Sequence, residues 1–128
     1  MYIVTVEIQA SPSKYWARLE FLDKTGRLHE KEIEAVRKAT QNSNILKALE
    51  EALISLQCPC MININTDSDY LTGAIRNGWL TTWQQNGWKN AKGKTIGNVE
   101  QWRRVTELLA AHSYKIIRTE SKNDTGRI

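Results

Sequence analysis

The sequence contains no long apolar segment. No stretch approaches the roughly 20 apolar residues that a transmembrane helix requires, which argues against a membrane-spanning protein. The first residues, from Met1 to Val6, lack the charged start, apolar stretch and small-residue cleavage site of a signal peptide. We therefore expect a cytoplasmic protein with no membrane partner.

Cysteine and histidine are also scarce, with two of each in the chain. Cys58 and Cys60 flank Pro59, and both His29 and His112 lie far from them in the sequence. A structural zinc site normally needs four well-spaced ligands. We therefore interpret the cysteines as reduced thiols at a turn between a helix and a strand.

The overall composition is that of an ordinary globular protein. The 128 residues are 41% hydrophobic and 25% charged, which predicts one globular domain spanning residues 1–128. The net charge of +4 is compatible with a nucleic-acid partner without requiring one. Tryptophan is frequent, and four of the five lie between residues 79 and 102.

The first part of the chain shows the two-residue period of strands. Residues 2–9 place Val4, Val6 and Ile8 on one face, and residues 14–22 alternate in the same way. After a short loop ending at Gly26, residues 27–35 form the returning strand. We expect three antiparallel strands in a meander.

The period then changes to that of helices, at residues 42–56, 69–79 and 98–112. Asn42, Ser43 or Asn44 can cap the first helix, Ser68 the second and Asn98 the third. Residues 60–66 and 113–118 read as two more strands. A strand that follows a helix suggests a parallel crossover, so the order β-β-β-α-β-α-α-β predicts an α/β fold with a mixed five-stranded sheet.

An ordered series of motifs lies between residues 65 and 102. Residues 66–70 read Thr-Asp-Ser-Asp-Tyr, residues 86–89 read Asn-Gly-Trp-Lys, and residues 98–102 read Asn-Val-Glu-Gln-Trp. With the order of strands and helices, this series resembles type 1 bacterial ribonucleases H over residues 1 to about 120. The chain also resembles the short ribonuclease H-like proteins of bacterial mobile elements.

The resemblance implies a ribonuclease H-like fold that lacks the family's C-terminal helix. The implied activity is hydrolysis of the RNA strand of an RNA–DNA hybrid by two Mg²⁺ ions. Because Mg²⁺ prefers oxygen ligands, the family holds the metals with four carboxylates, Asp-Glu-Asp-Asp. The implied cofactor is therefore Mg²⁺, bound weakly or not at all if the carboxylates are incomplete.

This carboxylate set is incomplete in the sequence. Asp67 matches the Asp of the Thr-Asp-Ser motif, whereas the helix Glu falls on Ile45, a core residue. The first-strand Asp falls on Glu7 or Gln9, of which only Glu7 can act as a charged ligand. Asp67 and Glu7 are therefore the candidate catalytic and metal-binding residues, with capping of the following helix as the alternative role of Asp67.

The fourth family carboxylate belongs to a helix after the last strand. The chain offers Glu120 or Asp124 as replacements there, and neither is a motif match. The glycine-rich loop between the first two strands is also reduced, to Ser-Pro-Ser at residues 11–13.

A basic, tryptophan-rich stretch is the candidate nucleic-acid surface. In the family the corresponding handle grips the DNA strand, and we assign Trp83, Trp88, Lys89, Lys92 and Lys94 to this role. Trp79 and Trp102 are expected in the core. The triplet at residues 84–86, Gln-Gln-Asn, replaces the basic triplet of the best-known members.

Residues 40–42 match a Thr-Asn-Asn stretch that contacts RNA 2′-hydroxyls in the family. Gln41 and Asn42 carry amides, which both donate and accept hydrogen bonds. Helix capping is the alternative role of Asn42.

Three functions remain open. The first is a catalytically degenerate protein that binds an RNA–DNA hybrid or duplex. The second is an active Mg²⁺-dependent hybrid endoribonuclease. The third is a non-catalytic scaffold for protein interactions.

Overall fold

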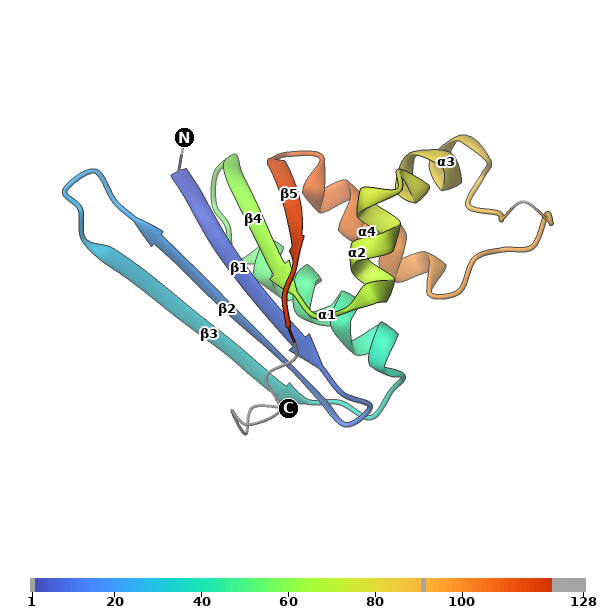
Figure 1. The fold of residues 1–128 in the computed structure, drawn as a ribbon, viewed down its shortest axis with the longest axis horizontal. Helices are drawn as coiled ribbons and strands as arrows, with labels where there is room; N and C mark the ends of the chain where they lie inside the picture. Colours follow the sequence, from blue (N-terminus) through green and yellow to red (C-terminus); the bar gives the residue numbers. More distant parts are fainter. Residues whose placement is uncertain (1, 91, 121–128) are drawn as a thin grey trace.

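The computed structural model describes residues 2–90 and 92–120, which form a five-stranded sheet and four helices (Figure 1). The chain order is β1 (Tyr2–Ala10), β2 (Lys14–Leu22), β3 (Leu28–Val36), α1 (Gln41–Ile54), β4 (Cys60–Thr66), α2 (Asp69–Arg76), α3 (Trp79–Gln85), α4 (Val99–Leu109) and β5 (Ser113–Arg118). None of the helices in these ranges is long and apolar enough to cross a membrane.

The sheet is mixed, as predicted, with strand order β3-β2-β1-β4-β5. The central strand β1 pairs antiparallel with β2 and parallel with β4. The parallel pairs β1–β4 and β4–β5 are each joined through helices, because a parallel neighbour can be reached only by a crossover. The carboxyl ends of β1, β4 and β5 therefore meet at one edge of the sheet.

The predicted alternation of buried and less buried side chains is confirmed. Val4, Val6 and Ile8 of β1 and Ile62 and Ile64 of β4 are all at most 1% exposed. They form one cluster with the apolar faces of the helices, which pack on this side of the sheet. The opposite face carries the side chains that alternate with these along each strand.

The helices differ from the prediction at several points, and α1, α2 and α4 end at Ile54, Arg76 and Leu109, two or three residues earlier than expected. Residues 79–85 form a separate helix, α3. The sequence predicted that residue 79 ends the second helix and predicted no element for residues 80–85. Helix α3 begins after Gly78, which separates it from α2. The φ of Gly78 is 71°, a left-handed conformation that glycine adopts without strain.

The predicted cap of α1 is wrong. Thr40 is the N-cap, and its hydroxyl accepts a hydrogen bond from the Ser43 N–H at 3.0 Å. The helix therefore starts at Gln41, one residue earlier than expected, and the three predicted capping residues lie inside its first turn. Asn98 does occupy the N-cap position of α4, but its side chain makes no capping hydrogen bond.

Candidate nucleic-acid interface and carboxylate positions

The carboxyl ends of β1 and β4 lie side by side in the sheet. Ile8 and Thr66 form the last pair of the two strands, and Gln9 and Asp67 each follow this pair by one residue. Gln9 is only 8% exposed. The residue that follows Ile8 is thus a neutral amide, which cannot supply the charge of a second carboxylate.

Glu7 lies one pair of positions further from this edge. It is paired with Asn65 of β4 and with Arg18 of β2, and it shares the face of Gln9 because strand side chains alternate. Glu7 and Asp67 are both partly buried. The structure therefore places the two predicted carboxylates on one face of the sheet but at different levels, and Asp124 lies outside the described residues.

The cap of α2 is made by Ser68, as predicted. Its hydroxyl accepts a hydrogen bond from the Leu71 N–H at 3.1 Å, and its own N–H donates to the Thr66 hydroxyl at 3.2 Å. Asp69 follows in the first turn and accepts a hydrogen bond from Arg118 at 2.9 Å. This hydrogen bond to the Asp69 carboxylate is the main cause that raises the pKa of the Arg118 guanidinium.

The donor set of the described residues does not fit a two-metal centre. Residues 2–90 and 92–120 contain no group of three histidine, cysteine or acidic side chains that could hold a metal ion. Ile45, at the position of the family's helix carboxylate, is 2% exposed and belongs to the core as expected. An ionised side chain there would be buried at a large desolvation cost.

The start of α1 is fixed by a buried polar cluster that the sequence did not reveal. Asn44 is fully buried, and its amide donates to the backbone carbonyls of Ser11 and Arg37, each at 2.8 Å. Its carbonyl oxygen accepts from the Arg37 guanidinium at 2.8 Å. These bonds tie the β1–β2 turn, the end of β3 and the first turn of α1 to one another.

The two amides assigned to RNA contact lie at this helix start. The Gln41 side chain donates to the Ala10 carbonyl at 3.0 Å, which fastens the helix to the carboxyl end of β1. Asn42 is exposed. On the other side, Ser43 bonds the Gln101 side chain of α4 at 2.7 Å. The candidate contact residue Asn42 is therefore flanked by two residues that fasten the start of α1, one to β1 and the other to α4.

The basic loop, residues 89–94, presents the three predicted lysines. Asn90 organises it, because its side-chain oxygen accepts hydrogen bonds from the N–H groups of Lys92 and Lys94 at 2.9 and 3.1 Å. Lys89 forms an antiparallel bridge with Thr95. All three lysine side chains are exposed, so the loop carries three cations toward solvent next to α3 and α4 (Figure 1).

A row of aromatic rings anchors this loop to the core. Trp102 is fully buried, as predicted, and its indole N–H donates to the Tyr70 hydroxyl at 2.7 Å. Trp83 packs edge-on against it at 5.5 Å between ring centroids. The predicted burial of Trp79 is wrong: this side chain is 45% exposed. It stands at the first position of α3, with its ring tilted against that of Trp83 at 6.1 Å between centroids and beside Gly73.

Trp88 is held beside the loop in a strained conformation. Its φ is 64°, in the left-handed region that non-glycine residues rarely adopt. Its N–H donates to the Trp83 carbonyl at 2.6 Å, and the Arg103 guanidinium lies 6.0 Å from its ring. Trp83 and Trp88 are both partly buried, so each can pack internally and still expose a ring edge.

A family model and a curated relative are both similar to this chain and are both named ribonuclease H. The family model described as RNase H matches residues 9–121. The ribonuclease H of Clostridium botulinum (strain Hall) is 41% identical over 97 residues, which are 75% of this chain and 65% of that protein. The chain thus spans slightly less than two thirds of the length of this relative.

Two solved structures show the same fold. The crystal structure of LC9-RNase H1, a type 1 RNase H with the type 2 active-site motif, has a TM-score of 0.76 at 17% identity over 94% of this chain and 65% of that chain. LC11-RNase H1 in complex with an RNA/DNA hybrid has a TM-score of 0.54 at 14% identity over 91% of this chain and 85% of that chain.

Proposed function

The chain belongs to the RNase H family, and from this premise we propose that it binds RNA–DNA hybrids or related duplexes without efficient hydrolysis. The observation that supports the proposal is the pairing register of β1 and β4, in which the last pair, Ile8 and Thr66, is followed by the neutral Gln9 on one strand and by Asp67 on the other. The burial of Ile45 supports the proposal, since an apolar core residue occupies the position of the family's helix carboxylate.

The electrostatics of metal binding favour the same conclusion. Two dications close together require several carboxylates to offset their mutual repulsion. Asp67 with Glu7 supplies at most two charges, and the two residues stand at different levels of the sheet. We therefore derive no hydrolytic step through Mg²⁺ for this chain, and the cytoplasmic location stays a prediction.

The surface that we propose for nucleic-acid binding retains its basic residues, in contrast to the incomplete carboxylate set. Lys89, Lys92 and Lys94 are exposed on a loop that Asn90 organises from within. Exposed cations neutralise phosphates and release counterions, which gives affinity without reading sequence. Asn42 is exposed in the first turn of α1, and we propose that its amide contacts a 2′-hydroxyl, which would favour RNA-containing strands.

The test is the affinity for a labelled 18-base-pair RNA–DNA hybrid measured at several salt concentrations. We expect binding that weakens steeply with salt, and a triple variant with Lys89, Lys92 and Lys94 each changed to Gln should lose most of it. The matched control changes three exposed lysines elsewhere, Lys24, Lys31 and Lys38, to Gln. Equal losses in the two triple variants, or no binding by the wild type, would contradict the proposal.

An active nuclease is the second candidate, and one observation favours it. Glu7 and Asp67 are two acidic residues near the carboxyl ends of β1 and β4, and together they would supply two negative charges to attract a single metal ion. This candidate differs from the first by requiring cleavage of the RNA strand that depends on Asp67.

A further inference from the structure

The sheet face opposite the helices is exposed at the amino-terminal end of β1, whereas Gln9 and Trp16 near the other end of this face are only 8% and 3% exposed. The helices of residues 2–90 and 92–120 pack against the other face. At the amino-terminal end of β1 this open face carries a row of exposed apolar side chains drawn from four strands: Leu28, Leu22, Ile3 and Met61, exposed by 51, 61, 62 and 39%. Four large apolar side chains exposed in one row indicate a contact surface.

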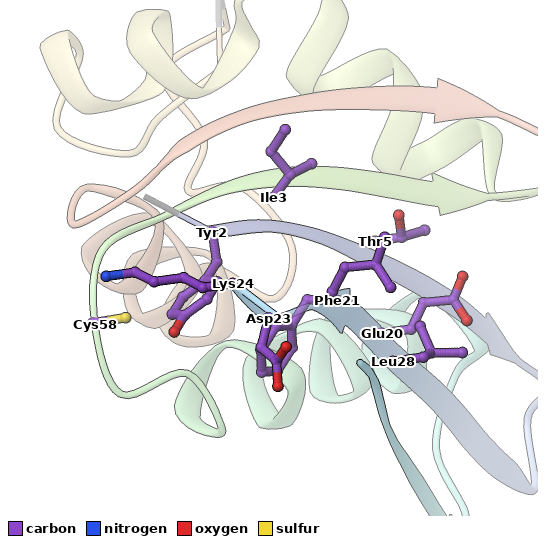
Figure 2. Close-up of a pocket in the computed structure, with 10 residues that line it drawn as sticks. Tyr2, Ile3, Thr5, Glu20, Phe21, Asp23, Lys24, Leu28 and Cys58 are labelled. Atoms are coloured by element: carbon purple, nitrogen blue, oxygen red, sulfur yellow. The ribbon is translucent and has the colours of Figure 1, made fainter. Parts of the chain in front are cut away.

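A hollow of about 880 Å³ extends around this end of the sheet, and five of its ten lining residues, Ile3, Thr5, Glu20, Leu22 and Leu28, belong to the open face. Figure 2 shows Ile3 and Thr5 among the residues that line it, both pointing to the side away from Tyr2. Glu20 and Leu28 line it as well. The hollow can receive apolar side chains from a second surface that packs on the face.

The next row across the face is charged, and its signs are ordered. From one edge of the sheet to the other it consists of Glu30, Glu20, Thr5, Asn63 and Lys115. The acidic side is extended by Glu32 and Glu34 of β3, and Arg18 of β2 pairs with Glu30 at 2.8 Å and with Glu20 at 3.3 Å. The β3 edge of the face is therefore negative, whereas the β5 edge carries Lys115.

We propose that this open sheet face binds the same face of a second copy of the chain, about a two-fold axis that runs along β1. Because β1 is the central strand, such an axis lays β3 over β5 of the second copy and β2 over β4. Glu30 of each copy then faces Lys115 of the other copy, so two such charge pairs form, and the apolar rows of the two copies pack against each other. The face is thus complementary to itself in this one orientation.

A two-fold axis across the strands would be unfavourable. It would lay β3 over β3 of the second copy, and Glu30, Glu32 and Glu34 would then face three glutamates. The axis along β1 brings the Glu7 residues of the two copies opposite each other. Because the contact is centred on the apolar row, Glu7 lies at its margin, where salt screens this repulsion. The order of strands and the distribution of charge therefore select the orientation.

The size of the contact is limited, because it is centred on the apolar row at one end of the strands. Five strands spaced about 4.8 Å apart, over the roughly five residues from Ile3 to Glu7 at about 3.3 Å each, make a patch of roughly 20 Å by 16 Å. Such a patch is smaller than the roughly 800 Å² per partner of a standard interface, so we expect the dimer to form only at high protein concentration. Packing of two sheets face to face is a common arrangement of this kind.

The first test is the molar mass in solution by light scattering at about 100 µM protein. We expect twice the 14.7 kDa of one chain. Ile3→Lys should give monomers, whereas Ile54→Lys, which places the same charge at a side chain 53% exposed on α1, should leave the dimer intact. A monomeric wild type, or a dimer that survives Ile3→Lys, would overturn the proposal.

The second test addresses the orientation. Glu30→Lys and Lys115→Glu should each give monomers when alone, because each puts like charges opposite one another. An equimolar mixture of the two variants should form a heterodimer, in which both charge pairs are restored. A mixture that stays monomeric, or single variants that still dimerise, would rule out the axis along β1. Thermal unfolding of each variant shows whether it is folded, and Arg18 keeps Glu20 as a partner in Glu30→Lys.

Discussion

Replacement of Asn44 by Ala should destabilise the protein strongly, because this amide connects three segments of the chain. Its three hydrogen bonds, all of 2.8 Å, join it to Ser11 and Arg37, and no part of it is exposed. Each buried group left without a partner costs about 1–3 kcal/mol. Ser11 and Arg37 are only partly buried, so water can reach some of these groups. We expect the free energy of unfolding to fall by about 2–4 kcal/mol.

The measurement is urea unfolding followed by tryptophan fluorescence, with Asn42→Ala as the matched control. Asn42 lies in the same first turn of α1 and is exposed. Helix propensity changes equally in both variants, so it cancels in the comparison. Asn42→Ala should stay within about 0.5 kcal/mol of the wild type. Equal stabilities of the two variants would refute the assigned role of Asn44.

Three further predictions concern the basic loop, His112 and Trp102. Each single change of Lys89, Lys92 or Lys94 to Gln should reduce the slope of log affinity against log salt by about 1 if that lysine contacts a phosphate; an unchanged slope would remove that lysine from the interface. Burial lowers the pKa of His112, whose ring nitrogen accepts from the Cys60 N–H at 3.0 Å. The neutral form is therefore favoured in the folded state, so this contribution to stability is present above about pH 6.5 and is lost as the pH falls. Urea unfolding of wild type and His112→Gln between pH 5 and 8 should show a smaller loss in the variant. Trp102→Phe should cost about 1–3 kcal/mol through the lost hydrogen bond to the Tyr70 hydroxyl, which keeps Asn98 as a donor, and the lost ring volume, and Trp102→Ala about 3–5 kcal/mol; similar stabilities of the two variants would contradict the packing role of the ring.

The strands and most of the core could be predicted from the sequence because their pattern is local. Val4, Val6 and Ile8 alternate with polar residues, and such a two-residue period has one interpretation as a strand with one buried face. Ser68 was identified as a cap for the same reason, since its position just before an apolar stripe is visible in the sequence.

Features that depend on distant partners could not be predicted. Asn44 is an ordinary surface residue type, and its burial follows from the position of Ser11 and Arg37 in the fold. Helix α3 has only seven residues, too few for the spacing of Leu80 and Trp83 to indicate a helix in the sequence, and it is held by contacts such as that between Trp83 and Trp102. The choice between Glu7 and Gln9 as the neighbour of Asp67 also depended on the pairing register, which alternation alone leaves open.

The most direct test of the proposed function is incubation of a labelled RNA–DNA hybrid with the protein in Mg²⁺ and in Mn²⁺, with binding and cleavage read from the same samples. The wild type and Asp67→Asn are compared. Binding that falls with salt, with an intact RNA strand in both proteins, is the result that a degenerate carboxylate set predicts. Cleavage by the wild type that Asp67→Asn abolishes would contradict the account and show that Asp67, with other carboxylates of the chain, forms a working metal site.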